Sequence, residues 1–230
     1  YTGVVKLVFS GGFLTGLVKG GSWFYKWLGD KKAARDLHPY FSFNEVRKHT
    51  QYYVTTKFQN IPPTREDEPG KEKDLAAKQS LLQFFLKTAL KKEGDNKRFY
   101  IILADSGMGK TTFMLNLFMR YTALTKPFRA YDMKLYPFKA PDLLERIKKI
   151  KEDGKAEKTI LLLDAFDEDE AAVADHRKRL DEIVNLVQSF REVIITSRSQ
   201  FFLKEEDIPF KLDIPKYTDG GGFHSFKKIY

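Results

Sequence analysis

The sequence predicts an α/β fold, with a parallel five-stranded sheet sandwiched by helices and a helical N-terminal extension. Three short apolar runs, at residues 99–103, 159–163 and 193–195, have the composition of buried strands. Each run leads into polar residues that suit the carboxyl edge of a parallel sheet, and stretches typical of helices separate the runs. The length of 230 residues and the hydrophobic fraction of 42% fit one such domain with an appended segment.

The composition limits the kinds of site and partner. The chain has no cysteine, which excludes a disulfide scaffold and a thiolate metal site and permits a cytoplasmic location. The net charge is +9, and residues 1–60 hold nine Lys and Arg against three Asp and Glu. This basic segment indicates an acidic partner surface or serves solubility alone, and we expect no specific nucleic acid. Because the sequence starts at Tyr1 without a methionine, we expect a fragment of a longer chain.

Residues 1–30 are rich in glycine and aromatic side chains. The uncharged run Leu7–Val18 is too short to span a bilayer, which takes about 20 apolar residues. Glycines nevertheless recur every four residues from Gly12 to Gly20, a spacing typical of closely packed membrane helices, and the cluster Trp23–Trp27 resembles an interfacial aromatic belt. Two interpretations stay open: association with an anionic membrane, or a glycine-rich helix that packs on protein or in oligomer contacts.

Residues 31–70 form a second region, expected to be mainly helical and to end in a linker. The charged, proline-rich stretch Asn60–Gly70 is the best domain boundary in the chain. A helix is predicted over Lys73–Lys92, and its buried face comprises Leu81, Leu82, Phe85 and Leu90. His38 and His49 have no partners at metal-binding spacing, so we interpret both as ordinary surface or capping residues.

A glycine-bearing turn links the first predicted strand to a helix. The strand runs from Arg98 to Ala104, and the helix begins near Gly109 with Lys110 and Thr111. Strand, glycine-bearing loop, Gly-Lys-Thr and helix in this order are typical of a phosphate-binding P-loop. Glycine lets backbone N–H groups surround a phosphate, and the helix directs its free amides and dipole at the same anion.

This pattern predicts the nucleotide contacts residue by residue. Lys110 would hold the β- and γ-phosphates, and the Thr111 hydroxyl would coordinate Mg²⁺. One departure is visible, because Ala104 stands where the pattern has its first glycine, and alanine is the mildest replacement. The predicted nucleotide-binding residues are Ala104, Asp105, Ser106, Gly107, Met108, Gly109, Lys110, Thr111 and Thr112.

The second apolar run supplies acidic residues. Before it we expect a weak strand at Phe128–Tyr131 and a helix over Pro141–Lys151, with Pro141 in the first turn. The run Thr159–Leu163 then ends at Asp164, which would hold Mg²⁺ opposite Thr111. Two further acids, Asp167 and Glu168, follow closely, and either could polarise the attacking water.

The third apolar run ends in an arginine. A helix is predicted from Glu170 to Phe190, followed by the strand Glu192–Ser197 and Arg198. Arg198 would lie at the same edge of the sheet as Asp164. Its planar, permanently charged guanidinium suits neutralisation of charge that develops on the γ-phosphate.

Three segments together resemble the NACHT NTPase domain, which belongs to the STAND class of signalling P-loop ATPases. These segments are Ala104–Thr112, Leu163–Glu168 and Val193–Arg198. The second segment is the most diagnostic, because a magnesium aspartate is followed by a small residue, an apolar residue and paired acids. The resemblance covers residues 71–230. It implies that Lys110, Asp167 or Glu168, and Arg198 serve hydrolysis, and that Thr111 and Asp164 bind Mg²⁺.

The resemblance also implies a role. Relatives rest with ADP, bind ATP, self-assemble when a trigger is sensed, and act in innate immune or antiviral defence. They continue into winged-helix and sensor regions, so we expect a cut near the last core strand, Lys227–Tyr230. The strand expected between the first two motifs favours the order 5-1-4-3-2 with right-handed crossovers.

Two rival functions stay open. One is an ordinary P-loop enzyme, such as a kinase, and the other is a membrane-anchored scaffold that binds nucleotide without turnover. The acids of Asp164–Glu168 and Arg198 favour hydrolysis over transfer. Neither the choice between ATP and GTP nor the trigger follows from the sequence.

Overall fold

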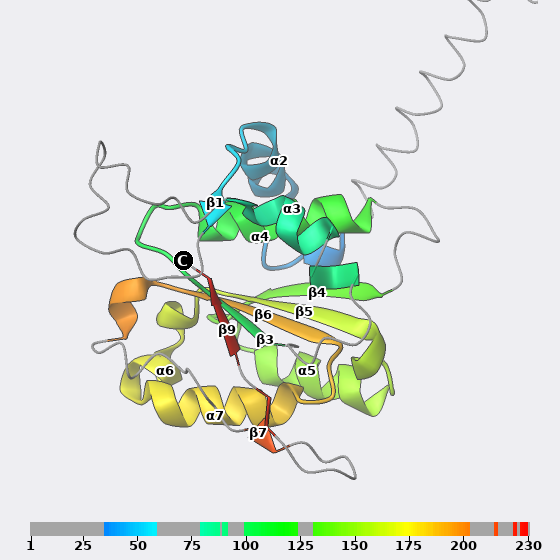
Figure 1. Ribbon diagram of the computed structural model, residues 1–230. Coiled ribbons are helices and arrows are strands. Elements are labelled where there is room, and N and C mark those ends of the chain that lie inside the picture. The colour runs from blue at the N-terminus through cyan, green and yellow to red at the C-terminus, as the bar shows by residue number, and fades with distance from the viewer. Residues whose placement is uncertain are drawn as a thin grey trace, which may run out of the picture.

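A parallel sheet lies at the centre of the molecule, between two layers of helices (Figure 1). The computed structural model describes residues 35–58, 79–87, 89–91, 99–123, 131–202, 214–215, 223–224 and 226–229. The sheet strands are β3 (Phe99–Leu103), β4 (Asp132–Pro137), β5 (Thr159–Asp164), β6 (Glu192–Ser197) and β9 (Phe226–Ile229). One face carries α2 (Phe43–Gln51), α3 (Leu81–Lys87) and α4 (Lys110–Thr122), and the other carries α5 (Leu143–Glu152), α6 (Glu170–Ala174) and α7 (His176–Val187).

Shorter elements connect this frame. They are β1 (Lys57–Phe58), β2 (Gln79–Ser80), β7 (Ile214–Pro215) and β8 (Phe223–His224), with 3-10 turns η1 (Ala89–Lys91), η2 (Ala156–Lys158), η3 (Phe166–Glu168) and η4 (Ser199–Phe201). β1 pairs antiparallel with β2, and β7 pairs antiparallel with β8.

The strand order puts three carboxyl ends next to one another. The order is β4-β5-β6-β3-β9, and every neighbouring pair is parallel. Numbered in chain order, it reads 2-3-4-1-5, which is the expected order 5-1-4-3-2 taken from the opposite edge. The α/β class and the parallel sheet flanked by helices are therefore confirmed. Because β5, β6 and β3 are adjacent, the residues that follow them share one edge.

Alternation along the strands builds two separate cores. In β3, the side chains of Phe99, Ile101 and Leu103 join the core that is covered by α5 and α7. Those of Tyr100 and Ile102 join the core that is covered by α3 and α4. The period of two in a strand directs successive side chains to opposite faces, so an apolar strand is buried on both.

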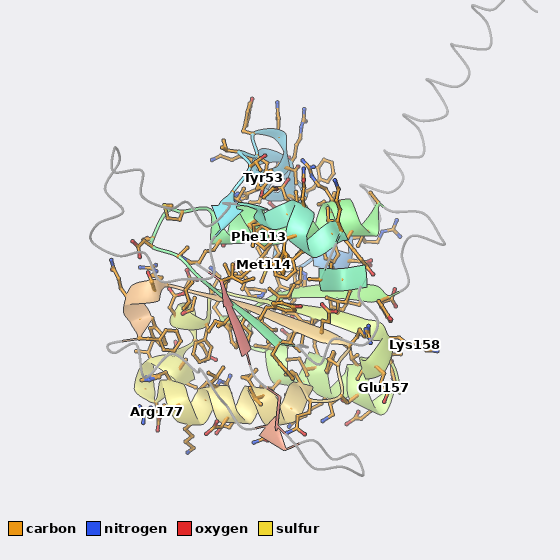
Figure 2. The ribbon with its side chains drawn as sticks, viewed as in Figure 1. Tyr53, Phe113, Met114, Glu157, Lys158 and Arg177 are labelled. Carbon is orange, nitrogen blue, oxygen red and sulfur yellow. The ribbon has the colours of Figure 1, made fainter. Side chains whose placement is uncertain are left out.

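The helices bury apolar side chains and expose charged ones. Phe113 and Met114 of α4 are buried in the core formed by α3, α4 and the sheet, whereas Lys158 and Arg177 extend from the outer surface (Figure 2). Burial of such large apolar side chains contributes about 1.5–3 kcal/mol each. This packing holds the N-terminus of α4 against the carboxyl edge of the sheet.

Four predicted elements have different bounds in the structure. The helix expected over Lys73–Lys92 begins only at Leu81, because Gln79–Ser80 is extended and pairs with β1. Leu81, Leu82, Phe85 and Leu90 are all buried as predicted, but Leu90 lies in η1, after α3 ends at Lys87. Residues 73–78 lie outside the described chain.

The strand expected at Phe128–Tyr131 was also misplaced. The strand that borders β5 is Asp132–Pro137, at an edge of the sheet, while residues 128–130 lie outside the described chain. An edge strand tolerates Asp132 and Pro137, because one of its sides needs no ladder hydrogen bonds. Because of those two residues, the strand is not an apolar run in the sequence.

The two helices predicted on the face that carries α5, α6 and α7 also have different bounds in the structure. The helix expected from Pro141 begins at Leu143, and Pro141 lies in the preceding turn. The helix expected over Glu170–Phe190 is two helices that break at Asp175. The Asp175 side chain accepts a hydrogen bond from the Lys178 backbone N–H at 3.0 Å, so it caps α7 and competes with a continuous helix.

The expectations for the N-terminal part are tested only in part. The membrane interpretation of residues 1–30 and the linker at Asn60–Gly70 lie outside the described residues. Within the described ranges, no helix is long and apolar enough to cross a membrane. The region 31–70 contributes α2, which begins with a capping box at Ser42 and Glu45.

Candidate nucleotide-binding site

The loop between β3 and α4 takes the conformation that its glycines allow. Gly107 has φ of 77°, and Gly109, the N-cap of α4, has φ of 80°. These left-handed angles strain residues that carry a Cβ, which explains glycine at both places. Ala104 is not among the positive-φ residues of the described chain, so its backbone is open to any L-residue. Alanine at this position therefore adds no backbone strain.

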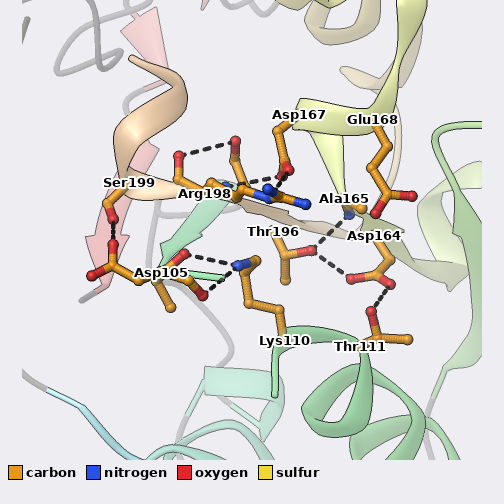
Figure 3. Close-up of polar contacts among 12 residues, drawn as sticks. Asp105, Lys110, Thr111, Asp164, Ala165, Asp167, Glu168, Thr196, Arg198 and Ser199 are labelled. Atoms are coloured by element: carbon orange, nitrogen blue, oxygen red, sulfur yellow. Dashed lines mark hydrogen bonds and ion pairs between the residues drawn. The ribbon is translucent and has the colours of Figure 1, made fainter. Parts of the chain in front are cut away.

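Lys110 lies across the loop that precedes it. Its ammonium donates hydrogen bonds to the backbone oxygens of Ala104 at 2.8 Å and Asp105 at 2.9 Å (Figure 3). Burial lowers the pKa of Lys110, and the neighbouring Asp167, Asp164 and Asp105 act against that effect. A partly desolvated ammonium gains more from an anionic ligand than a fully hydrated one does.

Thr111 and Asp164 meet across the loop and β5. The Thr111 hydroxyl donates to Asp164 Oδ2 at 2.7 Å, although 53 positions separate the two residues. Asp164 is 2% exposed, and burial raises its pKa against the hydrogen bonds from Thr196 and Thr111. A cation beside this carboxylate would favour the ionised form.

These two side chains fit a magnesium ion. Hydroxyl and carboxylate oxygens are its preferred ligands, and Mg²⁺ usually takes one or two protein ligands, with water and substrate phosphate completing its shell. The part of the chain that the structure describes has no group of three or more His, Cys, Asp or Glu that could hold a metal. Two protein ligands would leave positions in the shell of the ion for water and phosphate oxygens.

Thr196 links the second motif to the third. Its hydroxyl accepts a hydrogen bond from the Ala165 backbone N–H at 2.9 Å and donates one to Asp164 Oδ1 at 2.6 Å. From the sequence, Thr196 was expected only as a polar residue at the end of a strand. The available signal was a threonine directly after the apolar residues Val193–Ile195.

We expect Thr196→Val to destabilise the fold. The change keeps the shape of this fully buried side chain but leaves Ala165 N–H and Asp164 Oδ1 without their partner. An unsatisfied buried group costs about 1–3 kcal/mol. Urea unfolding measures the loss, and Thr196→Ser, which keeps the hydroxyl, is the matched control. Equal stability of the valine and serine variants would contradict this role.

The backbone conformation explains why a small residue follows Asp164. Ala165 has φ of 61° and is the one non-glycine residue of the described chain with a positive φ. The left-handed turn ends β5 and starts η3, which carries Asp167 and Glu168. A β-branched or bulky residue would be strained there.

The two acids of η3 have different surroundings. Asp167 Oδ1 accepts from the Arg198 backbone N–H at 2.9 Å, and Oδ2 lies 2.7 Å from Arg198 Nε (Figure 3). The Asp167 side chain is 6% exposed, whereas that of Glu168 is 42% exposed and lies 3.4 Å from Lys139 Nζ. Asp167 is thus committed to Arg198, and Glu168 is the more accessible acid.

Most of the predicted residues surround one pocket of about 330 Å³. Those that line it are Ser106, Gly107, Gly109, Lys110, Thr111, Thr112, Asp167, Glu168 and Arg198. The remaining predicted residues, Ala104, Asp105, Met108 and Asp164, do not line it. Asp105 instead contacts the Ser199 hydroxyl, Met108 is exposed, and Asp164 is buried and accepts the hydrogen bond from Thr111.

The pocket also includes residues that the sequence analysis did not assign to it. Ala165 lines it, and so does His49, which was interpreted as an ordinary surface or capping residue. His49 is half-buried in the last turn of α2, and its Nδ1 lies 2.7 Å from Thr112 Oγ1, a contact that was not predicted. No local pattern around His49 indicates this contact, since 63 positions separate the two residues.

Comparison of the sequence with protein-family models and with curated proteins gave no match.

Proposed function

We propose that this chain is a P-loop NTPase domain of NACHT type, which binds Mg·ATP and hydrolyses it slowly as part of a signalling switch. The observation that carries the proposal is the contact between Thr111 and Asp164 at 2.7 Å, beside the Lys110 ammonium. It joins the glycine loop to the end of a neighbouring strand, which is where a phosphate-bound Mg²⁺ needs its two protein ligands.

Each of the other residues has a defined task in the proposed hydrolysis. Lys110 exchanges its bonds with the loop carbonyls for bonds to phosphate oxygens. Thr111 and Asp164 would hold Mg²⁺, which would neutralise charge on the phosphates when bound. Glu168 accepts a proton from the water that attacks the γ-phosphorus, the bond to the β-phosphate oxygen breaks, and ADP and phosphate result.

The pairing of Arg198 with Asp167 supports distinct roles for the two acids. Asp167 holds Arg198 at the edge of the pocket through both backbone and side chain. From there the guanidinium could reach a γ-phosphate and stabilise its developing charge. Glu168, being more exposed, is our choice for the acid that polarises water.

The signalling role rests on the three motifs. A NACHT-type switch would rest with ADP and self-assemble with ATP after an unidentified trigger, in innate immune or antiviral defence. Residues 1–30 would contribute oligomer contacts or attachment to an anionic membrane. The location would be the cytoplasm, with or without the membrane surface.

A turnover measurement tests the enzyme proposal. The chain is incubated with Mg·ATP, and the release of ADP and phosphate is followed with and without candidate phosphate acceptors. Acceptor-independent phosphate release supports hydrolysis. Transfer only with an acceptor would favour a kinase, and bound ATP without release would favour a nucleotide-binding scaffold. Competition with GTP identifies the preferred base, and light scattering with each nucleotide tests self-assembly.

A further inference from the structure

The end of α2 is bound to the N-terminal turn of α4 at two places. His49 Nδ1 lies 2.7 Å from the Thr112 hydroxyl. The Asn116 side-chain amide donates to the backbone oxygen of His49 at 3.1 Å and to that of Thr112 at 2.8 Å. Asn116 is buried, so it fixes the two backbones relative to each other.

This arrangement brings an imidazole into the phosphate pocket. His49 lines the same cavity as Lys110, Thr111 and Arg198. It comes from an element that precedes the P-loop strand by about fifty positions and lies outside all three motifs.

The hydrogen bond can run in either direction, and the direction decides what Thr112 offers to a ligand. If the hydroxyl donates its proton to His49 Nδ1, only its lone pairs remain for the pocket, and these repel a phosphate oxygen. If Nδ1 carries the proton and donates, the hydroxyl proton is free to bind an anion. A neutral imidazole has one donor and one acceptor nitrogen, so both arrangements are available to it.

We propose that His49 is a positioning residue of the nucleotide site, which acts through Thr112. In the complex with a nucleotide, His49 Nδ1 carries a proton and donates to Thr112 Oγ1, and the Thr112 hydroxyl donates to a phosphate oxygen. Helix α2 is thereby part of the site, and nucleotide binding stabilises its docking on α4. This inference rests on the proposed function.

Substitution of His49 separates the hydrogen bond from mere packing. His49→Phe keeps an aromatic ring and removes the donor, whereas His49→Asn keeps an N–H near the position of Nδ1. Loss of one hydrogen bond weakens Mg·ADP and Mg·ATP binding by about two- to tenfold. We therefore expect that weakening for His49→Phe and wild-type affinity for His49→Asn, as measured by titration calorimetry.

A double-mutant cycle tests whether the effect passes through Thr112. In a Thr112→Val background, His49→Phe should cause no further loss of affinity, because the hydroxyl that it orients is absent. An undiminished effect in that background would contradict the relay.

The protonation of His49 Nδ1 can be measured directly, and a role in packing alone would not require it. Nitrogen-15 NMR of the four histidine side chains distinguishes protonated from unprotonated Nδ1, and the His49→Asn spectrum assigns the signal. With saturating Mg·ADP we expect His49 Nδ1 to be protonated.

The outcomes separate this inference from the proposed function. If the native chain binds neither nucleotide, both fail. If it binds but His49 Nδ1 is unprotonated in the complex, or His49→Phe binds as well as wild type, this inference alone is overturned. Unfolding temperatures of both variants show whether the fold is retained, and the Asn variant and the NMR signal decide the matter if the Phe variant is unstable.

Discussion

Lys110→Ala is expected to weaken Mg·ATP binding at least tenfold while the domain stays folded. Removal of one member of a desolvated, hydrogen-bonded charge pair costs on the order of 2–5 kcal/mol. The side-chain partners of Lys110 are the carbonyls of Ala104 and Asp105 in the loop, so its loss leaves both cores intact. Calorimetric titration with Mg·ATP measures the effect, and thermal unfolding checks the fold.

A lysine far from the pocket provides the matched control. Lys155 is exposed, pairs with Asp153 at 2.8 Å, and precedes the amino end of β5, at the opposite edge of the sheet from the pocket. Lys155→Ala removes the same charge from the chain and should bind Mg·ATP as wild type does. If Lys110→Ala also kept wild-type affinity, Lys110 would have no place in the site.

Glu168→Gln is expected to keep Mg·ATP bound and to slow its hydrolysis by about 10²–10⁴-fold, the usual contribution of a general base. The amide is similar in size but does not accept the proton of the attacking water. The Glu168 side chain is 42% exposed, and its ion pair with Lys139 is at the surface, so the fold should tolerate the change. Single-turnover release of phosphate measures the rate, and nucleotide titration checks binding.

Asp167→Asn is the paired comparison, because it changes the neighbouring acid in the same turn. An asparagine can keep the hydrogen bond from the Arg198 backbone N–H but loses the ion pair with its guanidinium, so we expect Arg198 to be less well held. If Asp167→Asn abolished turnover while Glu168→Gln kept the wild-type rate, Glu168 would be excluded as the base. Wild-type turnover in both variants would show that the acids are structural, and the proposed hydrolysis would then be wrong.

Local patterns in the sequence were enough for the parts of the fold that contain strongly apolar strands. β3, β5 and β6 were predicted within one residue or so, because a strand buried on both faces is a continuous apolar run. The glycine loop was also readable, since positive φ at Gly107 and Gly109 demands a residue type that stands out in a sequence. β4 was misplaced because, as an edge strand, it carries Asp132 and Pro137.

Apolar runs and the polar residues after them were enough to predict which residues lie at the carboxyl ends of the strands, and hence which could meet a phosphate and Mg²⁺. The different roles of those residues follow from contacts between distant parts of the chain. Asp167 and Glu168 are adjacent and chemically alike, and they differ because Arg198, 31 positions away, binds one of them. His49 and Thr112 are 63 positions apart, and their contact depends on how α2 packs on α4. Contacts of this kind leave no periodic trace in a single sequence, because they follow from the way distant surfaces pack and not from the preferences of neighbouring residues.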